Sequence, residues 1–394
     1  MAKTLIKEIL ERGVEQVLLR AHLVKRLERG DRLRVKFGID PTGPKIHLGR
    51  TVPLLKLRQL QELGHQIVLV IGDFTAQIGD PSDKLNKRPM LQPEQIAVNL
   101  SGYRQQLGKI LDLNKVEWRS NSDWLTKLSM LETAQLAEVF SFQQMAARRN
   151  FKERLAQDKD ISLREFMYPL MQGYDSVAVQ ADLEIGGNDQ LFNLLAGRQI
   201  QKHYNLPEQD ILTTQMLEGT DGRKMSTSWG NVINITDQPD EMYGRIMSIK
   251  DELVVKYLLL TTTLPMSDIK KIDKELRHGL NPKLAKEKLA YALLAFYHGE
   301  KSAKAAAEQF DQVHRQKKSP KQIPTYSWPV GVVKLADLLV YCQLASSKSE
   351  ARRLVEQGGV KLNQTVSVSP QQTVNKQKSL LIQVGKRRFA QIVG

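Results

Sequence analysis

Cysteine is almost absent from this chain, and histidine is scarce. One cysteine, Cys342, and seven scattered histidines occur among its 394 residues. A single thiol excludes a disulfide framework, and the histidines lack the spacing of zinc ligands. We therefore expect no structural metal in this protein.

Long hydrophobic runs are also missing. The stretch from Ile67 to Ile71 is one of the longer apolar runs, and it is far too short to span a bilayer. Residues 1–13 interrupt every apolar stretch with lysine, glutamate or arginine. These patterns predict neither an export signal nor a membrane segment, so we expect a cytoplasmic protein without a membrane partner.

Positive charge is what the chain has in excess. The formal net charge is +15, of which residues 331–394 contribute +7 and residues 240–330 contribute +5. A basic excess concentrated toward the carboxyl end is typical of a protein that binds a phosphate backbone, although a solvated basic surface produces the same composition. Charge therefore favours a nucleic-acid partner without establishing one.

The first part of the chain alternates strand and helix patterns. Residues 33–39 alternate apolar and polar side chains as a half-buried strand does. A helical pattern follows from His47 to a stop at Gly64, and residues 66–73 form an apolar run that is typical of a buried parallel strand. Strand, helix and strand form a right-handed crossover unit, so we expect a Rossmann-like, doubly wound α/β domain.

The remainder of the chain changes character at two places. A length of 394 residues predicts two or three domains. We place the α/β domain at residues 1–230, an α-helical domain at 231–320 and a proline-rich linker at 321–331. Residues 332–394 then form a small α+β domain, in which two predicted helices are followed by short strands.

Two basic signatures lie far apart in the chain. The first, Pro41–Arg50, opens the predicted helix, where phosphates are favoured by unpaired N–H groups and the helix dipole. Thr42 offers a hydroxyl there, His47 a ring donor and Gly49 a backbone without a side chain. An ordinary helix start would also fit this stretch. The second, Lys224–Ser228, lies in a polar, glycine-flanked stretch that alone would be read as a solvated turn.

Together the two signatures resemble those of class I aminoacyl-tRNA synthetases, which activate an amino acid with ATP. The resemblance implies that ATP is a substrate, that Mg²⁺ arrives with it, and that no dedicated protein metal cage is needed. It assigns the binding of ATP to the following residues: Gly38, Asp40, Thr42, His47, Gly49, Gly187, Asp189, Lys224 and Thr227. It assigns the stabilisation of the reacting phosphates to Thr42, His47, Lys84 and Lys224.

A third group of residues narrows the resemblance to one family of these synthetases. Tyr168, Gln172 and Asp175 lie at helical spacing on one face. This spacing resembles tyrosyl-tRNA synthetases, in which the tyrosine and glutamine hold the amino group of the substrate and the aspartate accepts its phenol hydroxyl. The resemblance adds Asp80 as a further ligand of the amino group and Gln190, in Gly186–Gln190, as the residue that faces the carboxylate.

Three positions depart from the family pattern. Lys36 stands where many relatives have a tyrosine that also binds the phenol, so Asp175 or a group not evident from the sequence must complete that contact. Arg50 replaces a common histidine, and Thr227 replaces the second lysine of the loop signature. Positive charge must then come from Lys224, from the nearby Arg223, and from Lys84 and Arg88.

The carboxyl-terminal part resembles an alpha-L RNA-binding domain in residues 346–363. The resemblance predicts phosphate contacts by Lys348, Arg352, Arg353 and Lys361. A second basic cluster, made of Arg148, Arg149, Lys152 and Arg154, fits either an acceptor stem or a solvated helix face. The family further implies tRNA(Tyr) and L-tyrosine as partners, a helical domain directed toward the anticodon, and a homodimer.

Two other functions remain open at this point. A tryptophanyl-tRNA synthetase shares the fold and both signatures, but it does not normally carry the terminal RNA module or the face formed by Tyr168, Gln172 and Asp175. A synthetase-like RNA-binding protein with decayed catalysis is the other alternative, and the departures at positions 36, 50 and 227 motivate it. The presence of Asp80, His47, Gln190 and Lys224 argues against decay.

Overall fold

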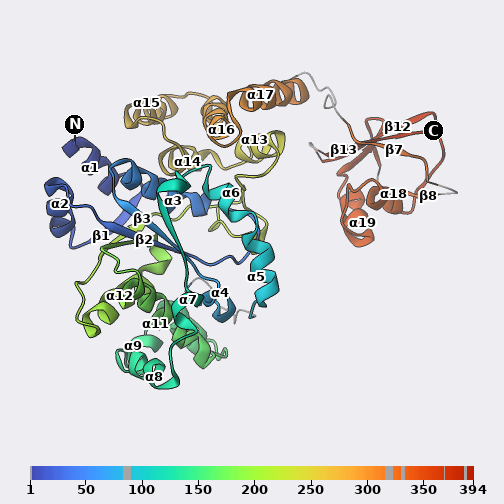
Figure 1. Cartoon of the computed structure of the whole chain (residues 1–394). Helices are drawn as coiled ribbons and strands as arrows, with labels where there is room; N and C mark the ends of the chain where they lie inside the picture. Colours follow the sequence, from blue (N-terminus) through green and yellow to red (C-terminus); the bar gives the residue numbers. More distant parts are fainter. Residues whose placement is uncertain (1, 83–89, 316–322, 330–332, 368, 386–387) are drawn as a thin grey trace. The chain divides into compact units, whose positions relative to one another are not determined.

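The chain folds into two compact units. The computed structural model describes residues 2–82, 90–315, 323–329, 333–367, 369–385 and 388–394. The first unit covers residues 1–304 and the second covers residues 305–394. Figure 1 shows the central sheet of the first unit between layers of helices.

A six-stranded sheet forms the centre of the first unit. Its strand order is β1-β6-β5-β2-β3-β4, in which β1 is antiparallel to β6 and all other neighbours are parallel. The strands are β1 Val14–Leu18, β2 Arg34–Ile39, β3 Gln66–Ile71, β4 Val116–Ser120, β5 Leu183–Gly187 and β6 Asp210–Thr214. The five residues from Ile67 to Ile71 are fully buried because helices cover both faces of the sheet.

The order of the strands creates a crevice. From β2 the chain proceeds outward through β3 and β4, and it then returns to the other side of β2 for β5 and β6. In a doubly wound sheet, ligands bind outside the carboxyl ends of the strands at such a reversal. The boundary between β2 and β5 is therefore the expected place for a site, and the predicted doubly wound α/β fold is confirmed.

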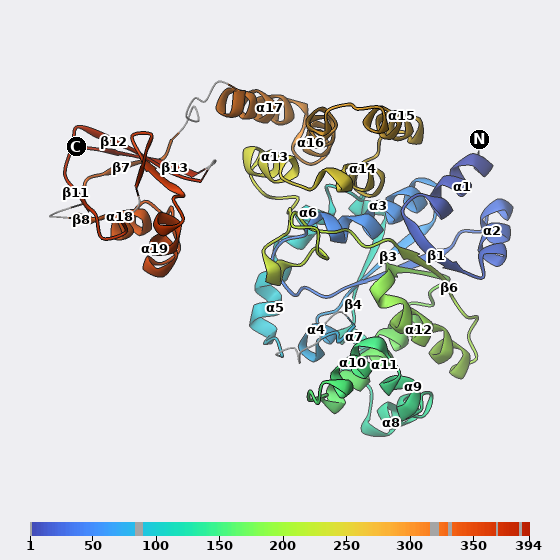
Figure 2. The same ribbon diagram turned by 180° about the vertical axis from the view of Figure 1, so that it is seen from behind.

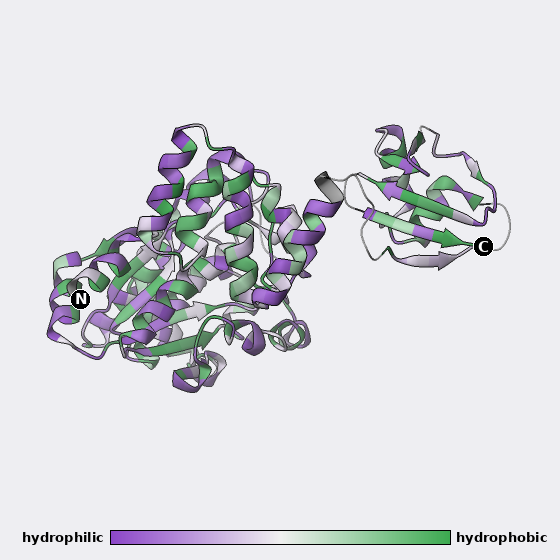
Figure 3. Ribbon diagram, turned by 90° about the horizontal axis from the view of Figure 1, so that it is seen from above, coloured by the Kyte–Doolittle hydropathy of each residue, from purple (hydrophilic) through white to green (hydrophobic). Residues whose placement is uncertain are grey.

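Helices cover the two faces of this sheet. Figures 1 and 2 show α3 and α14 on one face and α11 and α12 on the other. In Figure 3, hydrophobic residues, coloured green, predominate along the strands. The helices carry both hydrophobic residues and hydrophilic residues, which are coloured purple. The helices up to the last strand of the sheet are α1 Ala2–Glu11, α2 Arg20–Arg29, α3 Leu48–Glu62, α4 Thr75–Ile78, α5 Pro93–Leu100, α6 Tyr103–Leu107, α7 Ser122–Leu125, α8 Met130–Glu138, α9 Phe142–Ala146, α10 Arg149–Ala156, α11 Leu163–Ala178 and α12 Leu191–His203.

The helix that follows the first signature begins and ends where the sequence predicts. It begins directly after His47, and Gly64, just beyond its end, has the positive φ of 90° that glycine tolerates best. The fold thus places the first turn of α3 at the carboxyl ends of the strands.

Helices dominate after the sheet, as predicted. They are α13 Pro239–Met247, α14 Val254–Thr261, α15 Met266–Arg277, α16 Pro282–His298 and α17 Glu300–Arg315. Helix α14 packs against α3, so these helices up to residue 304 belong to the same compact unit as the sheet. The domain boundaries at 230 and 320 remain predictions. None of the described helices combines the length and apolar character that a membrane crossing requires.

The second unit is an α+β domain with its own core. Helices α18 Leu335–Tyr341 and α19 Lys348–Glu356 pack around residues such as Leu338, Val355 and Ile382. One sheet has the order β10-β9-β12-β13-β7 and a smaller one pairs β11 with β8. The strands are β7 Thr325–Ser327, β8 Val333–Lys334, β9 Val360–Leu362, β10 Thr365–Ser367, β11 Thr373–Val374, β12 Ser379–Val384 and β13 Arg388–Val393.

One part of the predicted linker is structured. Residues Thr325–Ser327, inside the segment 321–331 that we predicted to be a linker, form β7 and pair in parallel with β13. Three residues are too few to show periodicity, and the surrounding prolines mask the pattern. The sheet of the second unit therefore recruits an edge strand from a segment that looks irregular in sequence.

The contact between α11 and α12 is tight at Gly173. A Cβ at this position would lie 2.6 Å from Ile200 Cδ1 and 3.2 Å from the backbone carbonyl atoms of Ala196. We expect Gly173→Ala to lower the free energy of unfolding by about 1–3 kcal/mol, because overpacking moves the helices apart. Chemical denaturation measures this change.

Gly43→Ala is the matched control, since a Cβ at Gly43 meets no atom within 4 Å. Without a steric contact, this substitution should be neutral or slightly stabilising, because alanine lowers the conformational entropy of the unfolded chain. An equal loss of stability in both variants would contradict the close helix packing as its cause.

Candidate active site

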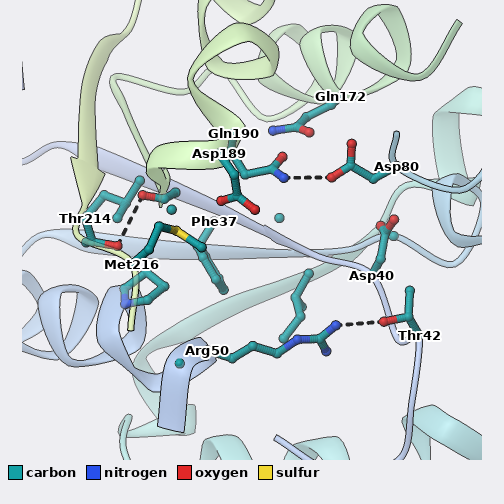
Figure 4. A pocket seen from close by; sticks show the side chains of 18 of the residues that line it. Phe37, Asp40, Thr42, Arg50, Asp80, Gln172, Asp189, Gln190, Thr214 and Met216 are labelled. Atoms are coloured by element: carbon teal, nitrogen blue, oxygen red, sulfur yellow. Dashed lines mark hydrogen bonds between the residues drawn. The ribbon is translucent and has the colours of Figure 1, made fainter. Parts of the chain in front are cut away.

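A cavity of about 580 Å³ lies at the carboxyl ends of the parallel strands. Its walls come from the segments after β2, β3, β4, β5 and β6, from the first turn of α3 and from α11 (Figure 4). The predicted residues that line it are Gly38, Asp40, Thr42, His47, Gly49, Asp80, Tyr168, Gln172, Asp175, Gly187, Asp189, Gln190, Lys224 and Thr227. Lys84 and Arg88, which we also predicted to contribute charge, lie outside the described residues.

Asp80 and Gln190 form a polar centre in one wall. Gln190 Nε2 donates to Asp80 Oδ2 at 2.7 Å, an interaction drawn in Figure 4. The other carboxylate oxygen accepts bonds from the backbone N–H of Ser82 at 2.9 Å and from its hydroxyl at 2.7 Å. Asn193 Nδ2 donates to Gln190 Oε1 at 2.9 Å. These bonds fix the orientation of an acidic and an amide group that face the cavity.

Tyr168 is joined to the loop that follows β2. Its hydroxyl donates to Asp40 Oδ2 at 2.9 Å, and Thr75 Oγ1 donates to Asp40 Oδ1 at 2.8 Å. Burial, followed by the nearby Asp40 charge, raises the pKa of the Tyr168 phenol well above its usual value. The hydroxyl therefore stays protonated, and it connects helix α11 to the loop that follows β2.

Asp175 has two hydrogen-bond donors that belong to none of the predicted site residues. Trp124 Nε1 donates to Asp175 Oδ1 at 2.8 Å, and Asn121 Nδ2 approaches Oδ2 at 3.3 Å. Asn121 also lines the cavity, and it directly follows the end of β4 at Ser120. Its place at the carboxyl end of a parallel strand is a signal that could have identified it. Asn121 therefore supplies a polar group beside Asp175.

Lys36 supports the cavity without lining it. Its Nζ is fully buried, donates to the carbonyl of Gln172 and to Ser176 Oγ, both at 2.7 Å, and lies 3.0 Å from Glu184 Oε1. Glu184 lines the cavity and accepts a hydrogen bond of 3.2 Å from Gln172 Nε2. The lysine at the departing position thus holds α11 and orients Gln172 through Glu184.

The two signatures meet at the first turn of α3. Gly49 N donates to Met225 Sδ at 3.3 Å, and Leu48 N donates to the carbonyl of Ile233 at 2.9 Å. A Cβ at Gly49 would lie 3.1 Å from His47 Nδ1 and 3.5 Å from the Met225 sulfur. Glycine here makes room for the histidine and the loop, in addition to the open backbone that the sequence suggested.

His47 is a neutral group in this site. Burial, followed by the charges of Arg50 and Lys224, lowers the pKa of its imidazole to about 3. The ring therefore carries no charge near neutral pH, and it can act by hydrogen bonding only. Positive charge in this half of the cavity must come from other side chains.

Lys224 and Arg223 have different surroundings. Lys224 Nζ lies 2.9 Å from Asp189 Oδ2, and both side chains line the cavity. Arg223 does not line the cavity: its guanidinium pairs with Asp221 at 2.6 Å and stacks 4.8 Å from the centre of the Trp229 ring. Arg223 therefore does not form part of the cavity wall, and its contribution of charge to the site stays a prediction.

Arg50 reaches across the cavity toward the loop after β2. Its Nη2 donates to Thr42 Oγ1 at 2.7 Å, and its Nη1 donates to the Tyr103 hydroxyl at 2.9 Å. Figure 4 shows the guanidinium pointing at Thr42. The sequence shows Arg50 only as a departure from the family pattern and does not reveal where its side chain lies.

Of the four cations in the basic cluster at α10, two are buried and two are exposed. Arg154 is fully buried against Glu165 at 2.7 Å, and Arg148 is buried with a 2.9 Å bond to Ser82 Oγ. Arg149 and Lys152 are exposed. The prediction that the whole cluster contacts an acceptor stem is thus wrong, because two of its four cations are buried in the protein interior.

The predicted RNA-contact residues lie in the second unit and are exposed. They are Lys348, Arg352, Arg353 and Lys361, placed on α19 and β9. Lys348 pairs with Asp337 at 2.7 Å. Among the residues that the structure describes, no group of three or more His, Cys, Asp and Glu side chains is arranged to hold a metal ion.

Asp175 gives the site a dependence on pH. Burial is the main reason that the pKa of this carboxyl rises to about 7, even though Lys36 and the two donors lower it. Between about pH 4 and pH 7 the folded protein keeps a proton that the unfolded chain releases, so stability falls as pH rises through this window. We expect Asp175→Asn to remove this slope.

The measurement is the free energy of unfolding of the wild type and the Asp175→Asn variant at about pH 4, 5.5 and 8. The difference, variant minus wild type, should increase with pH. A constant difference would contradict the assignment of the titration to Asp175, whatever the sign of the offset caused by altered hydrogen bonds.

Known proteins resemble the chain in sequence and in fold. A family model described as class I tRNA synthetases (W and Y) matches residues 28–315, and one described as a tyrosine–tRNA ligase SYY-like C-terminal domain matches residues 315–392. The chain is 44% identical to the tyrosine–tRNA ligase of Thermotoga maritima over 390 residues, covering 98% of this chain and 97% of that protein.

The tyrosine–tRNA ligase of Carboxydothermus hydrogenoformans is likewise 44% identical over 398 residues, with 98% of this chain and 97% of that protein covered. Among solved structures, a C-terminally truncated mitochondrial tyrosyl-tRNA synthetase of Aspergillus nidulans has the same fold, with a TM-score of 0.65 at 24% identity over 78% of this chain and 94% of that one. The chain therefore belongs to the tyrosine–tRNA ligase family of class I tRNA synthetases.

Proposed function

We propose that this protein is a tyrosine–tRNA ligase that works in two steps. It activates L-tyrosine with ATP to tyrosyl adenylate and pyrophosphate, and it then transfers the tyrosyl group to the 3′ end of tRNA(Tyr). The observation that carries this proposal is a single cavity in which both signatures meet the face of α11 formed by Tyr168, Gln172 and Asp175. The names of the relatives and the family model for the terminal domain favour this function over a tryptophanyl-tRNA synthetase.

The amino acid occupies the α11 side of the cavity in this proposal. Asp175, held by Trp124 and Asn121, accepts the phenol O–H. Asp80, Tyr168 and Gln172 surround the ammonium group, and Gln190 faces the carboxylate. Asn121 fills part of the role that the departure at Lys36 left open, because it lies beside Asp175 and lines the cavity.

Recognition of the phenol also provides specificity. A phenylalanine would leave the buried Asp175 carboxylate without the O–H donor. Sites of this kind reject the analogue by roughly 10⁴ to 10⁵, a magnitude known from tyrosine-selecting synthetases themselves. No editing step is needed at such a ratio.

ATP occupies the α3 side. Gly38, Gly187 and Asp189 border the space for the ribose, and a Cβ at Gly38 would meet no protein atom within 4 Å. Thr42, His47 and Lys224 face the phosphates, with Lys84, Asp40 and Thr227 as further predicted members of the site. Mg²⁺ bound to ATP would neutralise part of the phosphate charge.

The chemistry needs alignment and charge rather than a protein nucleophile. A carboxylate oxygen of tyrosine attacks the α-phosphorus, the bond to the bridging oxygen breaks, and the electron pair leaves with pyrophosphate. In the second step the oxygen of a ribose hydroxyl of the tRNA attacks the adenylate carbonyl, and the bond between the carbonyl carbon and the phosphate oxygen breaks. AMP leaves with that electron pair, and the hydroxyl proton is released to AMP or to solvent. Positioned reactants and preorganised donors supply the rate enhancement of both steps.

Amino-acid-dependent ATP–pyrophosphate exchange without tRNA tests this function. We expect exchange with tyrosine but not with tryptophan or phenylalanine. Asp175→Ala should reduce the preference for tyrosine over phenylalanine by at least about 100-fold. His47→Ala is the complementary variant: it should slow adenylate formation by about 100-fold while preserving tyrosine affinity and selectivity.

The alternatives predict other results. Exchange with tryptophan would overturn the assignment of the amino-acid pocket. Silence with all three amino acids, in a folded protein that still binds tRNA, would establish an RNA-binding protein with decayed catalysis.

The second unit is proposed to bind tRNA through Lys348, Arg352, Arg353 and Lys361, whose exposure supports this role. A cytoplasmic location fits a partner of this kind. Phosphate contacts of exposed lysine and arginine are independent of RNA sequence, so the identity of the tRNA must be read elsewhere.

A homodimer is proposed from an exposed apolar surface on the first unit. The exposed large hydrophobic side chains on which this proposal rests are Met130, Leu131, Phe142 and Leu163. They belong to α8, α9 and α11, which lie side by side in Figures 1 and 2. Leu163 is 79% exposed at the start of α11, the helix that carries the tyrosine-binding residues.

We expect Leu163→Asp to convert the dimer to a monomer, because a buried carboxylate at an interface is strongly unfavourable. Light scattering after size-exclusion chromatography measures the mass. Leu284→Asp is the control, since Leu284 is 43% exposed on α16, away from this surface. A wild-type monomer, or dissociation by both variants alike, would contradict the proposed interface.

A further inference from the structure

Arg50 is held in a defined orientation at the nucleotide side of the cavity. It lies in the first turn of α3, and its two terminal nitrogens donate to the hydroxyls of Thr42 and Tyr103. Tyr103 is itself fixed by a bond of 2.7 Å from its hydroxyl to the carbonyl of Gly43. The guanidinium is thus preorganised, and its remaining N–H groups can still donate to a ligand.

Arg50 differs from the two lysines that line the cavity, because no carboxylate pairs with it in the described part of the chain. Lys45 pairs with Asp237 at 3.3 Å and Lys224 with Asp189 at 2.9 Å. Both partners of Arg50 are neutral hydroxyls, and none of the carboxylates in the described part of the chain pairs with it. A half-buried cation without an anion is costly to keep, and a guanidinium matches two phosphate oxygens at once.

The loop signature lies against the same turn of α3. Met225 Sδ accepts a hydrogen bond of 3.3 Å from Gly49 N, one residue before Arg50. Thr227, two residues after Met225, lines the same cavity and carries no charge. The loop thus has no positive charge at Thr227, where the family has a lysine. Helix α3, which the loop contacts, has an additional positive charge at Arg50.

We propose that Arg50 is a catalytic residue that binds the β- and γ-phosphate oxygens of ATP and supplies the positive charge that the loop lacks at Thr227. This inference rests on the proposed function. Arg50 stabilises the negative charge that develops on pyrophosphate as its bond to the α-phosphorus breaks, and it transfers no proton. Thr42 Oγ1 accepts a hydrogen bond from the same guanidinium. The hydroxyl hydrogen of Thr42 therefore remains available to donate to a different acceptor.

Reciprocal substitution tests the proposal. Arg50→His, which restores the residue common in the family, should slow single-turnover formation of tyrosyl adenylate by about 100-fold. The dissociation constant of tyrosine should change less than about twofold, because Arg50 lies on the nucleotide side. Adding Thr227→Lys to Arg50→His should recover at least about tenfold of the lost rate, whereas Thr227→Lys in the wild type should give a much smaller gain.

Two further variants separate charge from structure. Arg50→Lys keeps the charge and should retain more activity than Arg50→Gln, which keeps N–H donors but not the charge. Rescue by Thr227→Lys is decisive, because a lysine at 227 cannot restore the bonds to Thr42 and Tyr103.

The outcomes distinguish this proposal from the function on which it rests. A wild-type protein without tyrosine-dependent exchange would refute the function itself. Normal exchange in the wild type together with an unchanged rate in Arg50→His, or a loss that Thr227→Lys does not reduce, would overturn the role of Arg50 alone.

Discussion

A buried ion pair joins the two halves of the catalytic sheet. Lys36 on β2 and Glu184 on β5 are neighbours across the strands where the order of the sheet reverses, and their charged atoms lie 3.0 Å apart with almost no exposure. Charges are removed from water at great cost, so such a pair persists only if its remaining hydrogen-bonding capacity is filled. Gln172, Ser176 and Gln209 fill it.

The hydrogen-bond partners of this ion pair come from other elements of the fold. Gln172 and Ser176 belong to α11, and Gln209 directly precedes β6. The same few polar atoms therefore connect β2, β5, the cavity-lining helix α11 and the next strand of the sheet, β6. A shift of any one element would leave a buried charge without a partner, and this penalty fixes the relative register of the elements around the cavity.

The sequence predicted the parts of this site that depend on local pattern. The crossover from β2 through α3 to β3 follows from periodicity and from the stop at Gly64, and the residues of both signatures meet because the carboxyl ends of parallel strands share one edge. Contacts between distant segments were not predictable. Trp124 reaches Asp175 from a short helix without a motif, and only the folded chain shows that Lys36 points away from the ligand space.

Burial is the other quantity that a sequence does not show. In the sequence, Arg148 and Arg154 look like surface cations next to Arg149 and Lys152. The fold buries both of them: Arg154 pairs with Glu165, and Arg148 donates a hydrogen bond to Ser82. The neutral state of His47 depends on the same kind of information, because it results from enclosure and from two nearby cations.

The bridge between Lys224 and Asp189 has a consequence for ligand choice under the proposed assignment of Asp189 to the ribose and Lys224 to the phosphates. A nucleoside that bound at Asp189 would separate it from Lys224 and offer the lysine no phosphate in exchange. A nucleotide with both ribose and phosphates would replace each half of the bridge with a contact of its own. The proposed function therefore predicts an electrostatic disadvantage for adenosine that ATP does not share.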